Sequence, residues 1–166
     1  ITQLCAELNA LPGRLLDDDG AALFRLQGGG KGTLTASQVC VGDMNDLAIS
    51  VYCEEAGLHW RQQEPNRLRL GRRDRPDEIW HAGANRAYVA PGILAIQRTP
   101  GGHPEGYLEA FANLYAAFGA DIRAGTQRAG DPGYATMIDA IVGMKFVRAC
   151  KRSSDQGAVW IDISSI

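Results

Sequence analysis

The chain has 166 residues, of which 45% are hydrophobic and 22% are charged, and its formal net charge is −2. This composition is typical of a single globular domain and excludes an intrinsically disordered chain. The acidic balance argues against a nucleic-acid-binding surface, and no apolar run approaches the roughly 20 residues of a membrane span.

The cysteines and the first residues of the chain bear on its cellular location. Cys5, Cys40, Cys53 and Cys150 stand singly in apolar runs, a pattern typical of small buried side chains in a reducing compartment. The opening residues lack the charged segment and the apolar core of a signal peptide. We therefore expect a cytoplasmic protein. Because the chain starts with Ile1 on a strand-like segment, we also expect it to be a piece of a longer polypeptide.

The first half of the chain has the alternating pattern of β-strands. Seven short strands are predicted, at residues 2–11, 21–26, 33–41, 46–55, 58–63, 67–72 and 77–82. Turns rich in Gly, Pro, Asn and Asp separate them, with no helices between. We expect antiparallel pairing, since a parallel crossover needs about a dozen or more intervening residues.

The second half is predicted to be mainly helical. Residues 83–102 have no hydrophobic period and predict a long surface loop. Apolar residues at helical spacing, from Tyr107 to Ile122, then predict an amphipathic helix. A second helix over 134–154 and a last strand over 158–163 follow. The fold class is therefore predicted as α+β, with a mostly antiparallel, open-faced β-sheet and two principal helices packed on one face.

Two rows of residues suggest how the open face of this sheet is used. Thr33, Thr35 and Ser37 share one side of their strand, and Ala48, Ser50 and Tyr52 share one side of theirs. These side chains are small or mildly polar, whereas a solvated sheet face normally carries charges. Because charged residues are depleted in protein contacts, we expect these rows to form a dimer face in a homo-oligomer.

Motifs that would carry chemistry are incomplete. The "GGGKG" stretch at residues 28–32 lacks the spacing of a phosphate-binding loop and joins two strands, so it predicts a turn. Successive carboxylates at Asp17, Asp18 and Asp19 point to opposite faces and cannot converge on a metal. His59 and His81 have no second ligand at a useful spacing. We therefore expect no metal site and no complete active site.

Several segments resemble one enzyme family. They are "GHPEGYLEAFANLYAAFGADI" at 102–122, "DAIVGMKFVRACKRSSDQGAVWIDI" at 139–163, "GTLTASQV" at 32–39 and "LHWRQQEPNRL" at 58–68. Together they are similar to the C-terminal domain of the Gfo/Idh/MocA family, named for glucose-fructose oxidoreductase, inositol dehydrogenase and a rhizopine-catabolism protein. The similarity covers essentially the whole chain.

This resemblance implies a function for the parent protein. Family members are NAD(P)-dependent oxidoreductases of sugars, cyclitols and related polyols, with an N-terminal Rossmann domain and a C-terminal domain whose open sheet often makes the subunit contact. Residues 1–166 then form a single C-terminal substrate and dimerisation domain. The alternative is a non-catalytic sheet domain that mediates oligomerisation or binds a carbohydrate.

The departures from the family pattern matter as much as the resemblance. The Rossmann glycine fingerprint and the Glu-Lys-Pro motif are absent, and the helix with the family's usual catalytic His and Asp falls before Ile1. NAD or NADP would therefore bind the full-length parent and not this fragment. The fragment alone is expected to have no catalytic residue and no activity.

Three interpretations of His103 are open. In the structural one, Gly101 and Gly102 allow a turn, Pro104 lies in the first helical turn and Glu105 favours the helix dipole. In the functional one, a neutral imidazole beside a loop offers a hydrogen bond to a substrate hydroxyl, and the resemblance implies that this loop borders the sugar pocket. An essential acid–base role is a third reading. The candidate substrate-binding residues are His103, Arg98 and Glu105.

Overall fold

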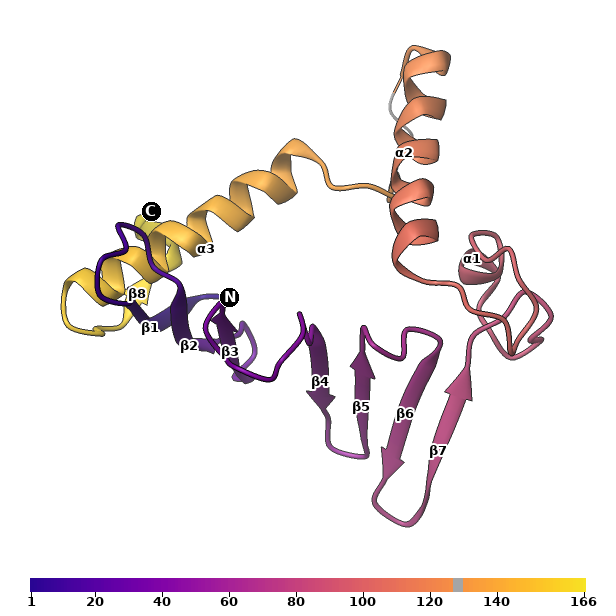
Figure 1. The fold of residues 1–166 in the computed structure, drawn as a ribbon, viewed down its shortest axis with the longest axis horizontal. Helices are drawn as coiled ribbons and strands as arrows, with labels where there is room; N and C mark the ends of the chain where they lie inside the picture. Colours follow the sequence, from indigo (N-terminus) through magenta and orange to yellow (C-terminus); the bar gives the residue numbers. More distant parts are fainter. Residues whose placement is uncertain (127–129) are drawn as a thin grey trace. The chain divides into compact units, whose positions relative to one another are not determined.

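The chain divides into two compact units in the computed structural model, which describes residues 1–126 and 130–166 (Figure 1). Unit 1 comprises residues 1–42 and 135–166, and unit 2 comprises residues 43–134. The strands are β1 (Gln3–Asn9), β2 (Asp19–Arg25), β3 (Lys31–Ser37), β4 (Ala48–Tyr52), β5 (Ala56–Arg61), β6 (Arg67–Arg72), β7 (Arg75–His81) and β8 (Ile161–Asp162). The helices are α1 (Pro91–Leu94), α2 (Tyr107–Ala124), α3 (Met137–Asp155) and the short 3₁₀-helix η1 (Ile163–Ser165).

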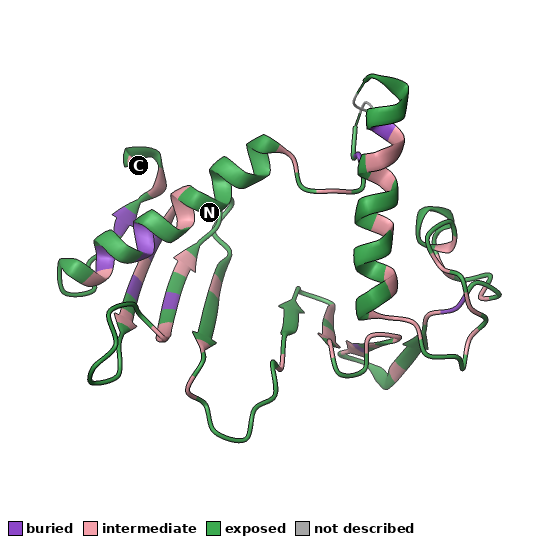
Figure 2. Ribbon diagram, turned by 45° about the horizontal axis from the view of Figure 1, so that its top comes forward, coloured by how far each residue is buried: buried purple, intermediate pink, exposed green. Residues whose placement is uncertain are grey.

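Unit 1 is an antiparallel sheet with one long helix on it. The strand order is β3-β2-β1-β8, and α3 packs against β1 and β8. The buried core lies between that helix and one sheet face, as Figure 2 shows. It consists of Leu4, Ala6, Ala22, Ala149, Cys150 and Ile161. The α3 helix thus covers the face formed by every second residue of β1 and β2.

The opposite face of this sheet is formed by the intervening residues. Thr33 pairs with Leu23, which pairs in turn with Cys5, and Thr35 pairs with Ala21. Because successive side chains of a strand point to opposite faces, these residues lie on the side away from α3. Leu23 is half exposed there, at 51% of its accessible surface.

The outer edge of β1 is completed by serine side chains. Strand β8 pairs with only Gln3 and Leu4 of β1, so the rest of that edge has no strand partner in the described chain. Farther along β1, past its pairing with β8, two backbone N–H groups donate to serine side chains of α3. The Ala6 N–H donates to Ser153 Oγ at 2.8 Å, and the Leu8 N–H donates to Ser154 Oγ at 3.0 Å. Helix α3 thereby satisfies donors that a longer β8 would otherwise satisfy.

Unit 2 contains the second antiparallel sheet and helix α2. The strand order is β4-β5-β6-β7, and each strand pairs with its neighbour in sequence. Helix α2 begins after Gly106, whose N–H donates to the Glu109 carboxylate at 2.8 Å. It ends at Gly125, where φ is +67°, the left-handed conformation that favours glycine at a helix C-terminus.

The predicted α+β class, with antiparallel strands and two principal helices, is confirmed. Two details differ from the sequence-based expectation. The strands form two four-stranded sheets rather than one, and Pro104 precedes the helix rather than lying in its first turn. The helix starts later because Gly106 and Glu109, and not Pro104, satisfy its first backbone groups. Among the described residues, no helix is both long and apolar enough to cross a membrane.

Candidate functional site

The segment between β7 and α2 is built by hydrogen bonds between its own two ends. The Ala84 N–H donates to the Thr99 carbonyl at 2.8 Å, and the Gly101 N–H donates to Asn85 Oδ1 at 2.8 Å. Gly83 is buried with φ +154°, and a Cβ there would lie 2.4 Å from the Gly101 nitrogen. Only glycine permits this close approach. The segment predicted as a loop is therefore a folded turn structure that includes the short helix α1.

Glu105 ties the end of this segment to the chain just before it. Its carboxylate accepts hydrogen bonds from the Arg98 N–H at 2.9 Å, from the Thr99 N–H at 2.9 Å and from the Thr99 hydroxyl at 2.8 Å. The Arg98 guanidinium lies 3.9 Å away, and only 12% of the Glu105 side chain is exposed. The carboxylate is thus occupied by its own chain, which makes it a positioning group for residues 98–99.

The environment of Glu105 keeps it ionised. Burial acts to raise the pKa of its carboxyl, but the hydrogen bonds from Thr99 and from the Arg98 backbone, together with the Arg98 charge, outweigh burial. The pKa of Glu105 is therefore lowered from its ordinary value. A carboxyl held in this way is a poor proton donor near neutral pH, so it is not suited to general acid chemistry.

His103 is exposed, as is Arg98. Its backbone N–H and its ring Nδ1 both lie 3.2 Å from the Pro100 carbonyl oxygen. Because a carbonyl oxygen only accepts hydrogen bonds, Nδ1 must carry the proton. In the neutral ring, Nε2 is then the acceptor nitrogen. The histidine can accept a hydrogen bond from a hydroxyl without rearrangement.

Of the three predicted substrate residues, the structure brings Arg98 and Glu105 into contact. His103 lies between them in sequence, in a turn where its ring contacts the Pro100 carbonyl. Sequence reasoning missed Thr99, which supplies two of the donors to Glu105. A Thr six residues before a Glu is no recognisable motif, because the turn that brings them together is set by the glycines of the segment.

The predicted dimer-face residues lie on two edge strands. Thr33, Thr35 and Ser37 are on β3, at the edge of the unit 1 sheet, and the second row is on β4, at the edge of the unit 2 sheet. Within that second row, Ser50 Oγ lies 3.0 Å from His59 Nδ1, and the Tyr52 ring contacts the His59 ring edge-on. The two rows therefore belong to separate sheet surfaces.

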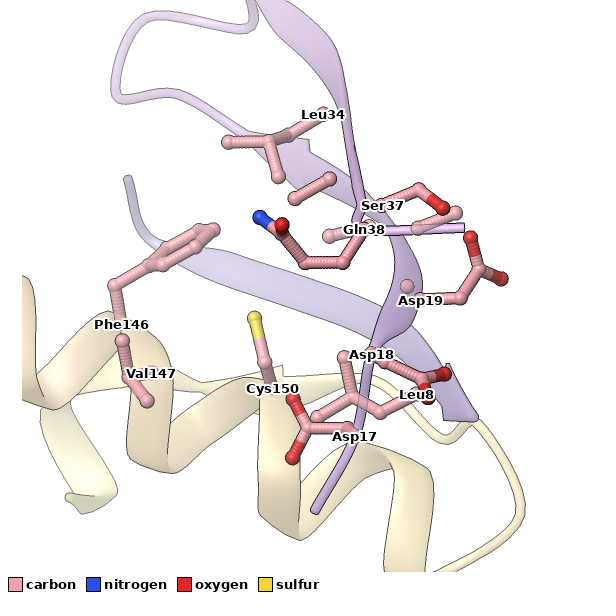
Figure 3. Close-up of a pocket in the computed structure, with 14 residues that line it drawn as sticks. Leu8, Asp17, Asp18, Asp19, Leu34, Ser37, Gln38, Phe146, Val147 and Cys150 are labelled. Atoms are coloured by element: carbon pink, nitrogen blue, oxygen red, sulfur yellow. The ribbon is translucent and has the colours of Figure 1, made fainter. Parts of the chain in front are cut away.

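Unit 1 contains a cavity of about 260 Å³ between α3 and the sheet (Figure 3). Apolar groups of Leu8, Leu34, Phe146 and Val147 line it, and the Cys150 sulfur points into it. Burial raises the pKa of the Cys150 thiol, which favours its unreactive protonated form. The cavity is also lined by the polar residues Asp17, Asp18, Asp19, Ser37 and Gln38. His103, Arg98 and Glu105 do not line it.

The described residues do not form a dinucleotide site or a metal site. The Gly-rich stretch joins β2 to β3 within a hairpin, where Gly28 and Gly29 have φ near +90° (+88° and +92°), so it opens no helix that could hold a pyrophosphate. This agrees with the turn predicted there. No group of three or more His, Cys, Asp or Glu side chains gathers as metal ligands among the residues described.

Comparison with known proteins relates the chain to oxidoreductases. No protein-family model matches it. It is 27% identical to the uncharacterized oxidoreductase YfiI of Bacillus subtilis over 151 residues, which is 89% of this chain and 38% of that protein. Its homologues are thus oxidoreductases.

Solved structures agree in fold with this chain. An oxidoreductase from Sinorhizobium meliloti is 38% identical, with a TM-score of 0.86, over 96% of this chain and 46% of that one. An inositol dehydrogenase homolog from Azotobacter vinelandii, complexed with NADH and myo-inositol, is 28% identical with a TM-score of 0.82. That match covers 97% of this chain and 44% of the other. The chain therefore spans less than half the length of each of these proteins.

Proposed function

We propose that this chain is the C-terminal, substrate-side domain of an NAD(P)-dependent oxidoreductase of the Gfo/Idh/MocA family, acting on a sugar, cyclitol or related polyol. The observation that carries the proposal is the match to the inositol dehydrogenase homolog over 97% of this chain and 44% of that one. Partial coverage of this kind is expected when one domain of a two-domain enzyme is compared with the whole. The match to the Sinorhizobium oxidoreductase supports the same division.

The nucleotide belongs to the part of the parent outside residues 1–166. When bound, NAD(P) would accept or deliver a hydride, but the described residues offer no strand–turn–helix unit for it. We assign no step of that transfer to this chain. The fragment alone is expected to be inactive, and its contribution to the parent is to bind and orient the substrate.

The cluster before α2 is the proposed substrate-contacting surface. His103 presents Nε2 as an acceptor for a substrate hydroxyl, since its Nδ1 is held by the Pro100 carbonyl. Arg98 contributes its guanidinium, and Glu105 orients the backbone of residues 98–99. These roles suit a polyol, whose hydroxyl groups both donate and accept hydrogen bonds.

The test is an assay of the full-length polypeptide that contains this chain. Purified protein is mixed with NAD⁺ or NADP⁺ and a panel of cyclitols, sugars and sugar alcohols that includes myo-inositol, and nucleotide reduction is followed by absorbance. We expect reduction with at least one member of the panel. His103→Phe should raise KM more than it lowers kcat, because the residue binds the substrate and performs no chemistry. A protein that binds carbohydrate but reduces neither nucleotide would instead be a non-catalytic binding module.

A further inference from the structure

The cavity of unit 1 is large enough for a small ligand and can be reached from solvent. Its volume of about 260 Å³ exceeds that of an engineered apolar cavity of roughly 150 Å³ that binds benzene. Leu34 on β3 and Val147 on α3 lie on its walls, and 43% and 56% of their accessible surfaces are exposed. All residues that line the cavity belong to unit 1, so its shape depends on one compact unit.

Two polar side chains that face the cavity have no hydrogen-bond partner within the described part of the chain. The Cys150 sulfur points into the cavity, and the residue is only 7% exposed. Gln38 donates its backbone N–H to the Asp18 carbonyl at 2.7 Å, which leaves its side-chain amide without a partner. A thiol and an amide can each donate a hydrogen bond. A ligand in the cavity would therefore meet unused polar groups as well as apolar walls.

The charge around the cavity is negative. Asp17, Asp18 and Asp19 line it, and no lysine, arginine or histidine is among the lining residues. Arg14 pairs with Asp18 at 3.2 Å, whereas Asp17 and Asp19 form no ion pair with any residue that the structure describes. Two carboxylates without a cationic partner disfavour an anionic ligand and favour a cationic one.

From these observations we propose that the cavity binds a small apolar amine. Its apolar body would lie between β3 and α3, against Leu34, Phe146 and Val147, and its ammonium group would lie at the Asp17 and Asp19 carboxylates. Burial of the apolar body supplies affinity, and the carboxylates supply the preference for a cation. Because this ligand differs in class from a polyol, the inference does not rest on the proposed oxidoreductase activity.

Three ligands that share a phenyl ring test the proposal without cofactor or turnover. Calorimetry on the full-length protein at pH 7 compares 2-phenylethylamine, which is protonated as a lysine side chain is, with neutral 2-phenylethanol and anionic phenylacetate. We expect the amine to bind at least about tenfold more tightly than the alcohol, and phenylacetate to bind more weakly than either.

Variants separate the charge from the cavity. The double replacement Asp17→Asn and Asp19→Asn should abolish the preference for the amine over the alcohol. Asp74→Asn is its control, because Asp74 lies between β6 and β7 with 75% of its side chain exposed. Ala36→Phe should weaken binding of the amine and the alcohol by at least about tenfold, since Ala36 lines the cavity and the added ring fills it. Val41→Phe, at a fully exposed residue outside the cavity, should bind like the wild type.

The proposal is overturned if the wild type does not bind 2-phenylethylamine at millimolar concentration, a result that would also follow if another part of the parent polypeptide filled the cavity. It is equally overturned if Ala36→Phe binds like the wild type, or if the double aspartate variant keeps the preference for the amine. Should Ala36→Phe lower the thermal stability, Val147→Trp replaces it and narrows the same cavity from α3.

Discussion

Single residues in the segment before α2 show how a charged side chain can serve the fold rather than a ligand. Glu105 has the appearance of a substrate-binding acid when only its sequence neighbours are considered. In the structure its carboxylate accepts hydrogen bonds from two successive backbone N–H groups and from one hydroxyl. The anionic oxygen atoms are therefore used within the chain, whereas His103 and Arg98 are exposed to solvent.

Replacement of Glu105 tests this positioning role. Glu105→Gln keeps the shape but removes the charge, so we expect the free energy of unfolding to fall by about 1.5–3 kcal/mol, as for hydrogen bonds to a charged group. Chemical denaturation of both proteins measures the difference. The control is Glu64→Gln, because Glu64 is 59% exposed and its carboxylate pairs with Arg67 on the surface. An equal loss in both variants would contradict the special role of Glu105.

The lowered pKa of Glu105 predicts how this contribution depends on pH. A carboxyl whose pKa is lower in the folded than in the unfolded protein stabilises the fold above the unfolded pKa of about 4.3. The contribution is lost as the pH falls through the folded pKa. Glu78, Glu109, Asp139 and Asp162 have lowered pKa values too, so stability should fall at acid pH in every variant.

The diagnostic quantity is the difference between wild type and Glu105→Gln. This difference in unfolding free energy should be constant from pH 7 to about pH 5 and then shrink towards pH 3. Denaturant titrations at several pH values measure it. A difference that stays the same across this range would show that Glu105 does not titrate differently in the folded protein.

At the scale of elements, helix α3 provides hydrogen-bond partners for the part of β1 that the two-residue strand β8 does not reach. Ser153 is fully buried, accepts a hydrogen bond from the Ala6 N–H and donates to the Val159 carbonyl at 2.6 Å. One hydroxyl thus joins α3, the edge of β1 and the chain leading into β8. The last turn of α3 is therefore part of the sheet edge as well as of the core.

Ser153→Ala should be more damaging than an ordinary serine replacement in a helix. It leaves the Ala6 N–H buried without an acceptor, which costs about 1–3 kcal/mol. Ser154→Ala is the matched control, because Ser154 makes the equivalent bond to Leu8 but is only partly buried. Thermal or chemical unfolding of the two variants gives the comparison, and equal effects would show that burial of the hydroxyl is unimportant.

Most strands and helices could be predicted from local sequence patterns. Which strands pair with one another across the chain could not. Alternation along β4 and the helical spacing of Phe111, Tyr115 and Phe118 are local properties, so strands and helices were predicted near their observed positions. Hairpin pairing followed from short turns. The division into two sheets falls at residues 38–47, a longer link with no local signal for what β3 and β4 pair with. The contact of β8 with β1 joins opposite ends of the chain and has no local signature either.

For the candidate site, proximity in sequence could be read, and the hydrogen-bond partners could not. Arg98 and Glu105 contact each other, and His103 lies between them in sequence, in contact with the Pro100 carbonyl. Which oxygen and nitrogen atoms remain free depends on partners such as Thr99 and on close approaches such as Gly83 to Gly101.

For the whole molecule, the open face of the unit 1 sheet supports the proposed self-association. Cys5, Ala21, Leu23, Thr33 and Thr35 border a shallow hollow of about 290 Å³ on the side away from α3. These side chains are small or apolar, and Leu23 is half exposed among them. Glu7 is charged and also borders the hollow, and Arg25 and Lys31 pair on the same face of the sheet, next to Leu23 and Thr33. The face of the unit 2 sheet that carries Ser50 carries Arg61 and Arg69. We propose the hollow, rather than the whole sheet face, as the surface of a symmetric contact.

A charge placed on that surface should separate the subunits. We expect the full-length protein to form a symmetric dimer or larger assembly that buries at least about 1,000 Å² through the Thr33 and Thr35 face. Thr35→Lys would bury an unpaired charge twice in a two-fold contact, so association should weaken by at least about tenfold. Gln27→Lys, in the exposed turn between β2 and β3, adds the same charge away from the hollow and should leave association unchanged. Sedimentation velocity at micromolar concentrations measures all three proteins. A wild type that stays monomeric at tens of micromolar, or a Thr35→Lys variant that sediments like the wild type, would show that this face does not join the subunits.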